Sequence, residues 1–197
     1  MASIGHVLFG LAVARAHDRY GAAPDRPARL RVTAAATFGA LALAPDLDVI
    51  AFALGIPYGA ELGHRGAAHS LVAGVVVGVT AGLVLARSLR AALVPTVLAA
   101  VVAVTSHGLL DALTDGGLGV ALCWPWSDAR MFAPVQPLPV APIGRAFLTA
   151  RGLTVAASEL AWFAPCAIYA LVGGRATRLA RRLTAAPGAA RGHARDR

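Results

Sequence analysis

Charged side chains are scarce in this sequence: they make up only 14% of its 197 residues, whereas hydrophobic residues make up 57%. The mean hydropathy is +0.65. So little polar surface cannot cover a water-soluble domain of this length, which excludes that class and favours an integral membrane protein. Lysine is absent altogether, so all eighteen basic residues are arginine. Together with the many alanines this indicates a GC-rich genome, and we attach no mechanism to it.

Cysteine is nearly absent as well. Cys123 and Cys166 stand alone, without the CxxC spacing of a metal site, and neither requires a disulfide. A convincing signal peptide is also missing, because residues 2–14 are apolar but lack a basic segment before them. The net charge of +8 would suit a nucleic-acid-binding protein, but the arginines fall in short loops and the tail, as membrane topology predicts. We therefore expect no nucleic-acid partner.

Apolar segments fill most of the chain. Five can be distinguished, at residues 2–16, 32–56, 67–86, 91–113 and 153–173. The third and fourth have the length of about 20 residues that a bilayer requires, and the short turn between them predicts an antiparallel hairpin. The second contains Pro45, which removes a backbone donor, so we expect a kinked helix or two half-helices there. The last segment predicts a single span.

The predicted fold is all-α. It is a polytopic membrane helical bundle of about five hydrophobic helices, one of them broken at Pro45. Residues 114–152 are rich in Gly and Pro and predict an ordered, non-helical connection. We expect residues 1–175 to form the membrane domain and residues 176–197 to form a basic, disordered tail.

The loop charges predict an orientation. The positive-inside rule places the arginine-rich loops at residues 15–31, 87–90 and 175–182 in the cytoplasm of a bacterial inner membrane. Polar residues of all five segments then lie near the outer face: His6, Asp46, Asp48, His64, His69, His107, Asp111 and Glu159. The orientation follows from the loop charges alone, yet it brings polar residues of separate segments to the same membrane face. We therefore predict that they form one site.

These side chains have the chemistry of a metal site. Imidazole and carboxylate groups bind divalent transition metals, and placing them in a membrane without a task is costly. His107 and Asp111 are four residues apart, so they share one helix face and form a workable ligand pair. A structural hydrogen bond between them is the alternative. Asp115 extends the same face by another turn.

His64 and His69 flank a glycine at the start of an apolar segment. If the helix begins near Ala67, both histidines can reach one centre, and Arg65 can bind an anionic substrate oxygen. The alternative is a loop histidine at the interface followed by a polar helix cap. His6 alone would be an ordinary interfacial histidine, but its matching depth makes it a further candidate ligand.

Asp46 and Asp48 are two residues apart, so on a regular helix they would face different ways. At a helix break both can turn inward and flank a metal. A turn or a helix cap is the alternative, and it is a poor one inside an apolar run, where an unpaired carboxylate costs several kcal/mol. Glu159 also needs a partner, for which the metal and the arginines of the long connection are candidates.

Together these motifs resemble the YdjM-like family of predicted membrane-bound metal-dependent hydrolases. The resemblance extends from the N-terminal histidine to about Trp126. It is carried by His6, Pro45-Asp46-Leu47-Asp48, His64-Arg65-Gly66 with His69-Ser70, and Ser106-His107 with Leu110-Asp111, Thr114 and Gly116. It implies a multi-span helical protein with a metal-dependent hydrolase activity. The chain departs from the family in having Ala68, where a threonine is expected before the second histidine.

The resulting prediction is a hydrolase with one or two divalent metal ions, zinc first and Mn²⁺ or Fe²⁺ as alternatives. The predicted ligands are His6, Asp46, Asp48, His64, His69, His107 and Asp111. Asp48 or Asp115 would act as general base, and Arg65 would neutralise developing charge. A site at the lipid boundary indicates a phosphoester of an amphipathic substrate. Two alternatives remain: an ion or metal transporter, and a protein whose polar residues only hold helices together.

Overall fold

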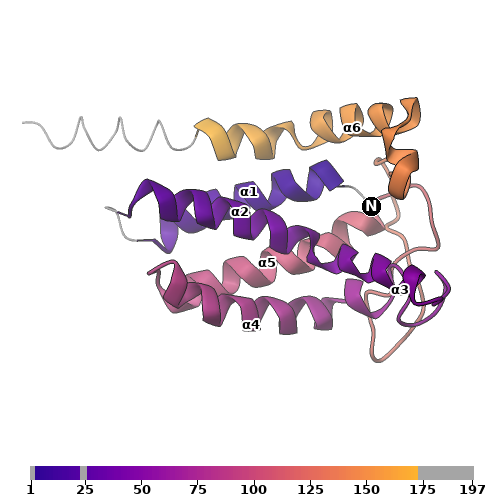
Figure 1. Cartoon of the computed structure of the whole chain (residues 1–197), viewed down its shortest axis with the longest axis horizontal. Helices are drawn as coiled ribbons and strands as arrows, with labels where there is room; N and C mark the ends of the chain where they lie inside the picture. The colour runs from indigo at the N-terminus through magenta and orange to yellow at the C-terminus, as the bar shows by residue number, and fades with distance from the viewer. Residues whose placement is uncertain (1–2, 23–25, 173–197) are drawn as a thin grey trace, which may run out of the picture.

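Helices make up most of the computed structural model, which describes residues 3–22 and 26–172. In chain order they are α1 (Ser3–Tyr20), α2 (Ala28–Leu43), η1 (Ala44–Val49), α3 (Ile50–Ala53), η2 (Ala67–His69), α4 (Leu71–Ser88), α5 (Leu93–Ala112), η3 (Gly144–Leu148) and α6 (Ala150–Trp162). α1, α2, α4 and α5 run side by side, and α6 follows α1 on the outside of this bundle (Figure 1). The predicted all-α class is confirmed.

Within the described residues, three helical stretches are long and apolar enough to cross a membrane. They are the combined stretch Ala28–Ala53, α4 and α5. A fourth span results if Ala150–Trp162 and Ala164–Val172, which are bent by 58° relative to each other, are counted together. The prediction of about five hydrophobic helices is therefore slightly too high. The difference is α1, whose last turns carry the charged residues Arg15, Asp18 and Arg19.

Two breaks interrupt the apolar segments. The predicted break at Pro45 is confirmed, because α2 ends at Leu43 and the chain continues as the 3₁₀ helix η1. Proline is tolerated at this first turn, where its missing N–H has no partner to lose. The second break is at Phe163, where the last predicted span is bent by 58° between Ala150–Trp162 and Ala164–Val172. Pro165 follows two residues later and disfavours a continuous helix.

α4 and α5 form the predicted hairpin. Gly74, Gly78 and Gly82 of α4 are buried against α5. A Cβ atom built on Gly78 would lie 2.5 Å from the Cα of Val101, so only a glycine allows this approach of the two helices. Small residues at helix contacts are what membrane helices use to pack closely.

All the polar motifs lie at one end of the bundle. η1, η2 and the connection after α5 are at this end, and the turn between α4 and α5 is at the other (Figure 1). The end of α1 also lies there, since the Ala92 amide donates to the carbonyl oxygen of Gly21 at 3.0 Å. The predicted tail, residues 176–197, lies outside the described residues.

Candidate metal centre

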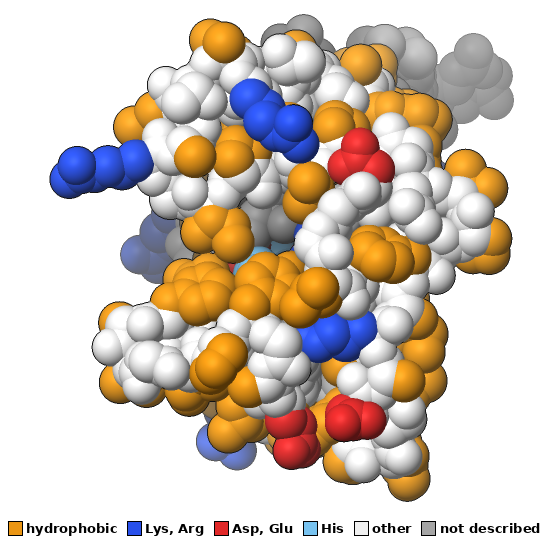
Figure 2. Space-filling view, turned by 90° about the vertical axis from the view of Figure 1, so that its right-hand side faces the viewer, with side chains coloured by type: hydrophobic (Ala, Val, Ile, Leu, Met, Phe, Trp, Pro, Cys, Tyr) orange, Lys and Arg blue, Asp and Glu red, His pale blue; other side chains and the backbone are white. Residues whose placement is uncertain are grey.

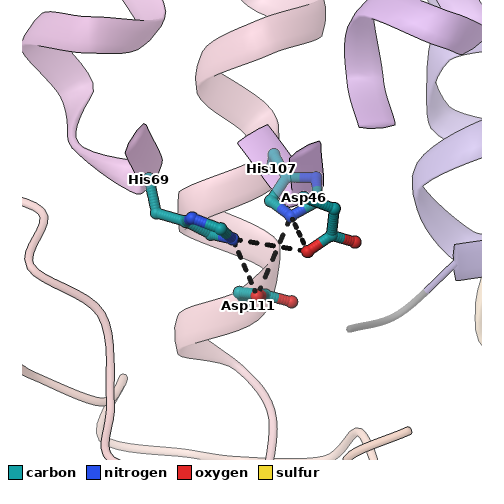
Figure 3. A group of neighbouring side chains, drawn as sticks. All are labelled: Asp46, His69, His107 and Asp111. Carbon is teal, nitrogen blue, oxygen red and sulfur yellow. Dashed lines mark ion pairs between the residues drawn. The ribbon is translucent and has the colours of Figure 1, made fainter. Parts of the chain in front are cut away.

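Four side chains from three segments point toward one another at this end (Figure 3). Asp46 comes from η1, His69 from η2, and His107 and Asp111 from the last turns of α5. Asp46 Oδ1 lies 3.5 Å from His69 Nε2 and 3.3 Å from His107 Nε2. Asp111 Oδ2 lies 3.6 Å and 3.9 Å from the same two nitrogens. The four ligand atoms all lie within 4.8 Å of one another.

This group is buried, and three of its ligand atoms have no hydrogen-bond partner. The side chains of His69, His107 and Asp111 are fully buried, and that of Asp46 is 11% exposed. Asp46 Oδ1, His69 Nε2 and His107 Nε2 make no hydrogen bond. Buried polar atoms in proteins are almost always paired, so three unpaired atoms facing one point fit a bound cation. Two imidazole nitrogens and two carboxylate oxygens are a donor set that suits a tetrahedral zinc ion.

The end of α2 orients one ligand. His107 Nδ1 lies 2.7 Å from the carbonyl oxygen of Ala42, which can only accept, so Nδ1 carries the proton. Ala42 is in the last turn of α2, where carbonyl groups have lost their helical partners. Nε2 is therefore unprotonated in the neutral ring and faces the centre of the group. This is the usual arrangement for a metal-binding histidine.

Asp48 organises the residues around this group. Its Oδ1 accepts a hydrogen bond from His64 Nδ1 at 2.6 Å, and its Oδ2 accepts one from the Arg65 backbone amide at 3.1 Å. Oδ2 also lies 3.0 Å from His69 Nδ1. Burial lowers the pKa of His69, but the Asp46 and Asp48 carboxylates outweigh burial and raise it. Asp46, Asp48, His64 and His69 form a second group that could hold a metal ion.

Arg65 neutralises part of the negative charge. Its guanidinium is fully buried, with Nε 2.9 Å from Asp111 Oδ2 and Nη1 donating to the carbonyl oxygen of Gly116 at 2.9 Å. The sequence assigns this arginine to an anionic substrate, whereas in the structure its nearest carboxylate is Asp111. Its backbone has a φ of +62°, which places η2 directly after a tight turn.

His6 lies beside the first group without joining it. Its ring stacks on His107 with centroids 3.8 Å apart, and its Nε2 is 3.8 Å from Asp111 Oδ1. Neither group that could hold a metal includes it. Glu159 reaches the same region from α6, where its Oε2 accepts hydrogen bonds from the amides of Ile4 and Gly5 at 2.9 and 3.0 Å. These backbone amides, rather than an arginine, are its hydrogen-bond partners.

Asp115, a candidate general base from its sequence position, lies outside both groups. It is exposed, and its Oδ1 accepts a hydrogen bond from the Val140 amide at 2.7 Å. It therefore fastens the connection after α5. A helical turn begins at Ala67, but it is the 3₁₀ turn η2, which contains His69. The α-helix α4 begins only at Leu71, because Ser70 caps it by accepting from the Ala73 amide.

Arg130, a candidate partner of Glu159 from the sequence, instead binds the segment before η2. Its guanidinium donates to the carbonyl oxygens of Tyr58, Ala60 and His64 at 2.8–3.1 Å and lies over the Tyr58 ring. Burial raises the pKa of that tyrosine. An isolated arginine in a Gly/Pro-rich stretch offers no signal of this role.

A close contact between α5 and η2 lies at Gly108, where a Cβ atom would lie 2.2 Å from the carbonyl oxygen of His69, so glycine is required beside the ligands.

The surface at the end of the molecule that carries this group is hollowed. Figure 2 shows this face with histidine side chains at the bottom of a central depression and hydrophobic side chains around it. Asp46 is the most exposed member of the first group. Its neighbours Leu47 and Ile50 are 66% and 58% exposed, so the entrance lies in an apolar surface.

Comparison with known proteins identifies the relatives of this chain. The family described as YdjM inner membrane protein matches residues 1–181. The chain belongs to the YdjM family. Inner membrane protein YbcI of Escherichia coli (strain K12) is 46% identical to it over 123 residues, which are 62% of this chain and 71% of that protein. No solved structure matches the chain. The family and the apolar helices support a location in the bacterial inner membrane.

Proposed function

We propose that this YdjM-family protein is a metal-dependent hydrolase that cleaves a phosphoester or similar bond of a lipid-like substrate at the outer face of the inner membrane. The observation that carries the proposal is the group of Asp46, His69, His107 and Asp111, whose ligand atoms lie within 4.8 Å of one another. A multi-pass arrangement with the arginine-rich loops in the cytoplasm would place this group near the outer leaflet.

Each residue of the centre has a role in this proposal. Asp46, His69, His107 and Asp111 hold the metal ion, with zinc preferred for this mixture of donors. A divalent ion there would supply Lewis-acid chemistry, lowering the pKa of water and polarising the bond to be cleaved. Asp48 holds His69 from the far side of its ring, or binds a second metal ion together with His64.

Charge and access favour an anionic substrate that enters from the bilayer. Arg65 offsets the negative charge of Asp111. A bound divalent cation would offset the remaining negative charge of the centre, so that the centre would not repel an anionic substrate. Asp46 faces the entrance, and Leu47 and Ile50 beside it are exposed. An apolar entrance suits a substrate whose polar head sits at the membrane surface.

Hydrolysis by the purified protein tests this proposal. The full chain in detergent, loaded with zinc or manganese, would be assayed on phosphodiester, carboxylic ester and peptide substrates. We expect phosphoester cleavage that Asp46→Asn abolishes and that the exposed control Asp128→Asn leaves unchanged. A metal-loaded protein without activity on any of the three substrate classes would refute it.

A transporter is the second candidate, because an aspartate at a helix break is also a feature of ion pathways. The break between α2 and η1, which precedes Asp46, is the observation in its favour. Against it, both groups that could hold a metal lie at one end of the bundle rather than through its depth. Zinc or manganese uptake into proteoliposomes, abolished by Asp46→Asn, would support transport.

A further inference from the structure

An apolar groove runs along the outside of the bundle between α2 and α4. Its volume is about 440 Å³. Thr37 and Leu41 of α2 form one wall, and residues from Val76 to Leu85 of α4 form the other. Both helices pack on α5, which lies between them. At a rise of 1.5 Å per residue the α4 wall extends over roughly 14 Å.

The groove has no polar group to offer a ligand. Its two hydroxyl groups are used inside their own helices, because Thr37 donates to the carbonyl oxygen of Thr33 at 2.8 Å and Thr80 to that of Val76 at 2.8 Å. The valines at its edge, including Val76 and Val84, are 60% and 61% exposed. Both walls belong to stretches apolar enough to span a membrane, so the groove would open to hydrocarbon.

The walls of the groove lead to the metal centre. α2 continues from Leu41 into η1 and reaches Asp46 five residues later, and α4 is preceded by His69, seven residues before Val76. These two ligands lie 3.5 Å apart, so the two walls meet at the centre. Along the helix axes, the near end of the groove is roughly 8–10 Å from the ligands. This distance leaves room for the polar head of a lipid.

We propose that this groove binds one acyl chain of a phospholipid whose phosphate lies at the Asp46 centre. The inference rests on the proposed function and makes it more specific, since it selects substrates with a long hydrocarbon chain. The argument for this occupant is continuity: a hydrocarbon-lined groove inside the spans ends where Asp46 and His69 meet. A second copy of this chain is the competing occupant.

Photolabelling tests the groove without requiring turnover. The full chain would be reconstituted in lipid nanodiscs that contain a trace of phosphatidylglycerol with a diazirine on one acyl chain. We expect labelling of Val77 at least fivefold above that of Val79, which is on the opposite face of α4. The two valines are 43% and 37% exposed, so lipid contact alone would label them about equally. Equal labelling would overturn the proposal.

A blocking variant gives a second readout. Ala81→Trp would fill the groove, and Val79→Trp adds the same side chain outside it. We expect Ala81→Trp to reduce Val77 labelling at least fivefold and phospholipid hydrolysis at least tenfold, while metal content and cleavage of p-nitrophenyl phosphate stay unchanged. Val79→Trp should change none of these. Equal effects of both variants would overturn the proposal.

The outcomes separate this inference from the function on which it rests. Cleavage of p-nitrophenyl phosphate without preferential groove labelling would refute the groove and leave the hydrolase. Preferential labelling without hydrolysis of any substrate would refute the hydrolase and leave the chain-binding groove. Crosslinks between two protein chains at Val77, together with a dimeric mass in nanodiscs, would show that a second copy occupies the groove and would overturn the proposal.

Discussion

The Oδ2 atom of Asp48 lies 3.0 Å from Nδ1 of His69, across the imidazole ring from Nε2, which faces Asp46 and Asp111. One histidine thus contacts carboxylates on both sides. A metal-binding histidine usually presents its second nitrogen to a carboxylate or carbonyl group, which sets the ring orientation. Nε2 of His69 is therefore the atom that belongs to the first group. Asp48 belongs only to the second group, so its role depends on whether the site holds one metal ion or two.

Asp48→Asn should weaken metal binding without abolishing it. If Asp48 only orients His69, we expect affinity to fall about 10- to 100-fold at an unchanged stoichiometry. If Asp48 is a ligand of a second ion, the stoichiometry should fall from two to one. Elemental analysis and titration against a competing chelator measure both quantities. Unchanged affinity and stoichiometry would contradict both roles.

His69→Ala and Asp46→Asn should each abolish metal binding while the protein remains in the membrane. His69→Ala removes the ligand atom Nε2, and Asp46→Asn removes the negative charge of the ligand Oδ1; neither atom has a hydrogen-bond partner in the structure. Metal content per chain after detergent purification is the measurement. Asp128→Asn, an exposed carboxylate outside both groups, is the matched control and should retain full metal content. Full metal content in a protein that carries both His69→Ala and Asp46→Asn would exclude this centre.

Arg65→Gln should destabilise the metal-free protein. The change takes the guanidinium away from the buried carboxylate of Asp111, and losing one partner of a buried ion pair costs about 3–5 kcal/mol. Thermal unfolding in detergent measures the loss, which added zinc should reduce because the ion would also compensate the carboxylate. The exposed Arg87→Gln is the control. Equal melting temperatures of Arg65→Gln and the unmodified protein would contradict the prediction.

Gly78→Ala should loosen the α4–α5 hairpin, whereas Gly39→Ala should not. A Cβ on Gly78 would lie 2.5 Å from backbone, and such overpacking costs about 1–3 kcal/mol. A Cβ on Gly39 meets nothing closer than 3.9 Å, so the better helix propensity of alanine should stabilise α2 by about 0.5–1 kcal/mol. Opposite shifts of the melting temperature are expected. Shifts of the same sign would contradict this packing.

Glu159→Ala should release the N-terminus of α1 from α6. The carboxylate accepts from the Ile4 and Gly5 amides, directly before His6. In Glu159→Ala we expect both amides to exchange faster than in the unmodified protein. In Glu159→Gln, which keeps an acceptor oxygen, we expect them to exchange more slowly than in Glu159→Ala. Exchange rates at the start of α2 serve as the internal reference. Identical rates in the alanine and glutamine variants would show that Glu159 does not hold α1.

The sequence predicts the helices and the candidate residues of the site, but not which of these side chains meet. Hydropathy indicates α4 and α5, and Pro45 indicates the break before Asp46, because both signals are local along the chain. It does not indicate that His6 stacks on His107 outside both groups, or that Asp115, the candidate general base, accepts a hydrogen bond from a backbone amide. These contacts depend on how the helices pack against one another and which faces they turn inward, and hydropathy does not determine either.

By itself the sequence determined that the chain is a membrane bundle and that the histidines and aspartates of the four motifs share one depth. Both follow from the cost of polar groups in hydrocarbon and from the charge of the loops. Only the tertiary structure decided which atoms meet. Asp46, His69 and Asp111 come from three separate segments, and the contact between α5 and η2 at Gly108 brings them within reach of one ion. Together with His107 they form a buried set of imidazole and carboxylate groups, which is the chemistry that a divalent cation binds.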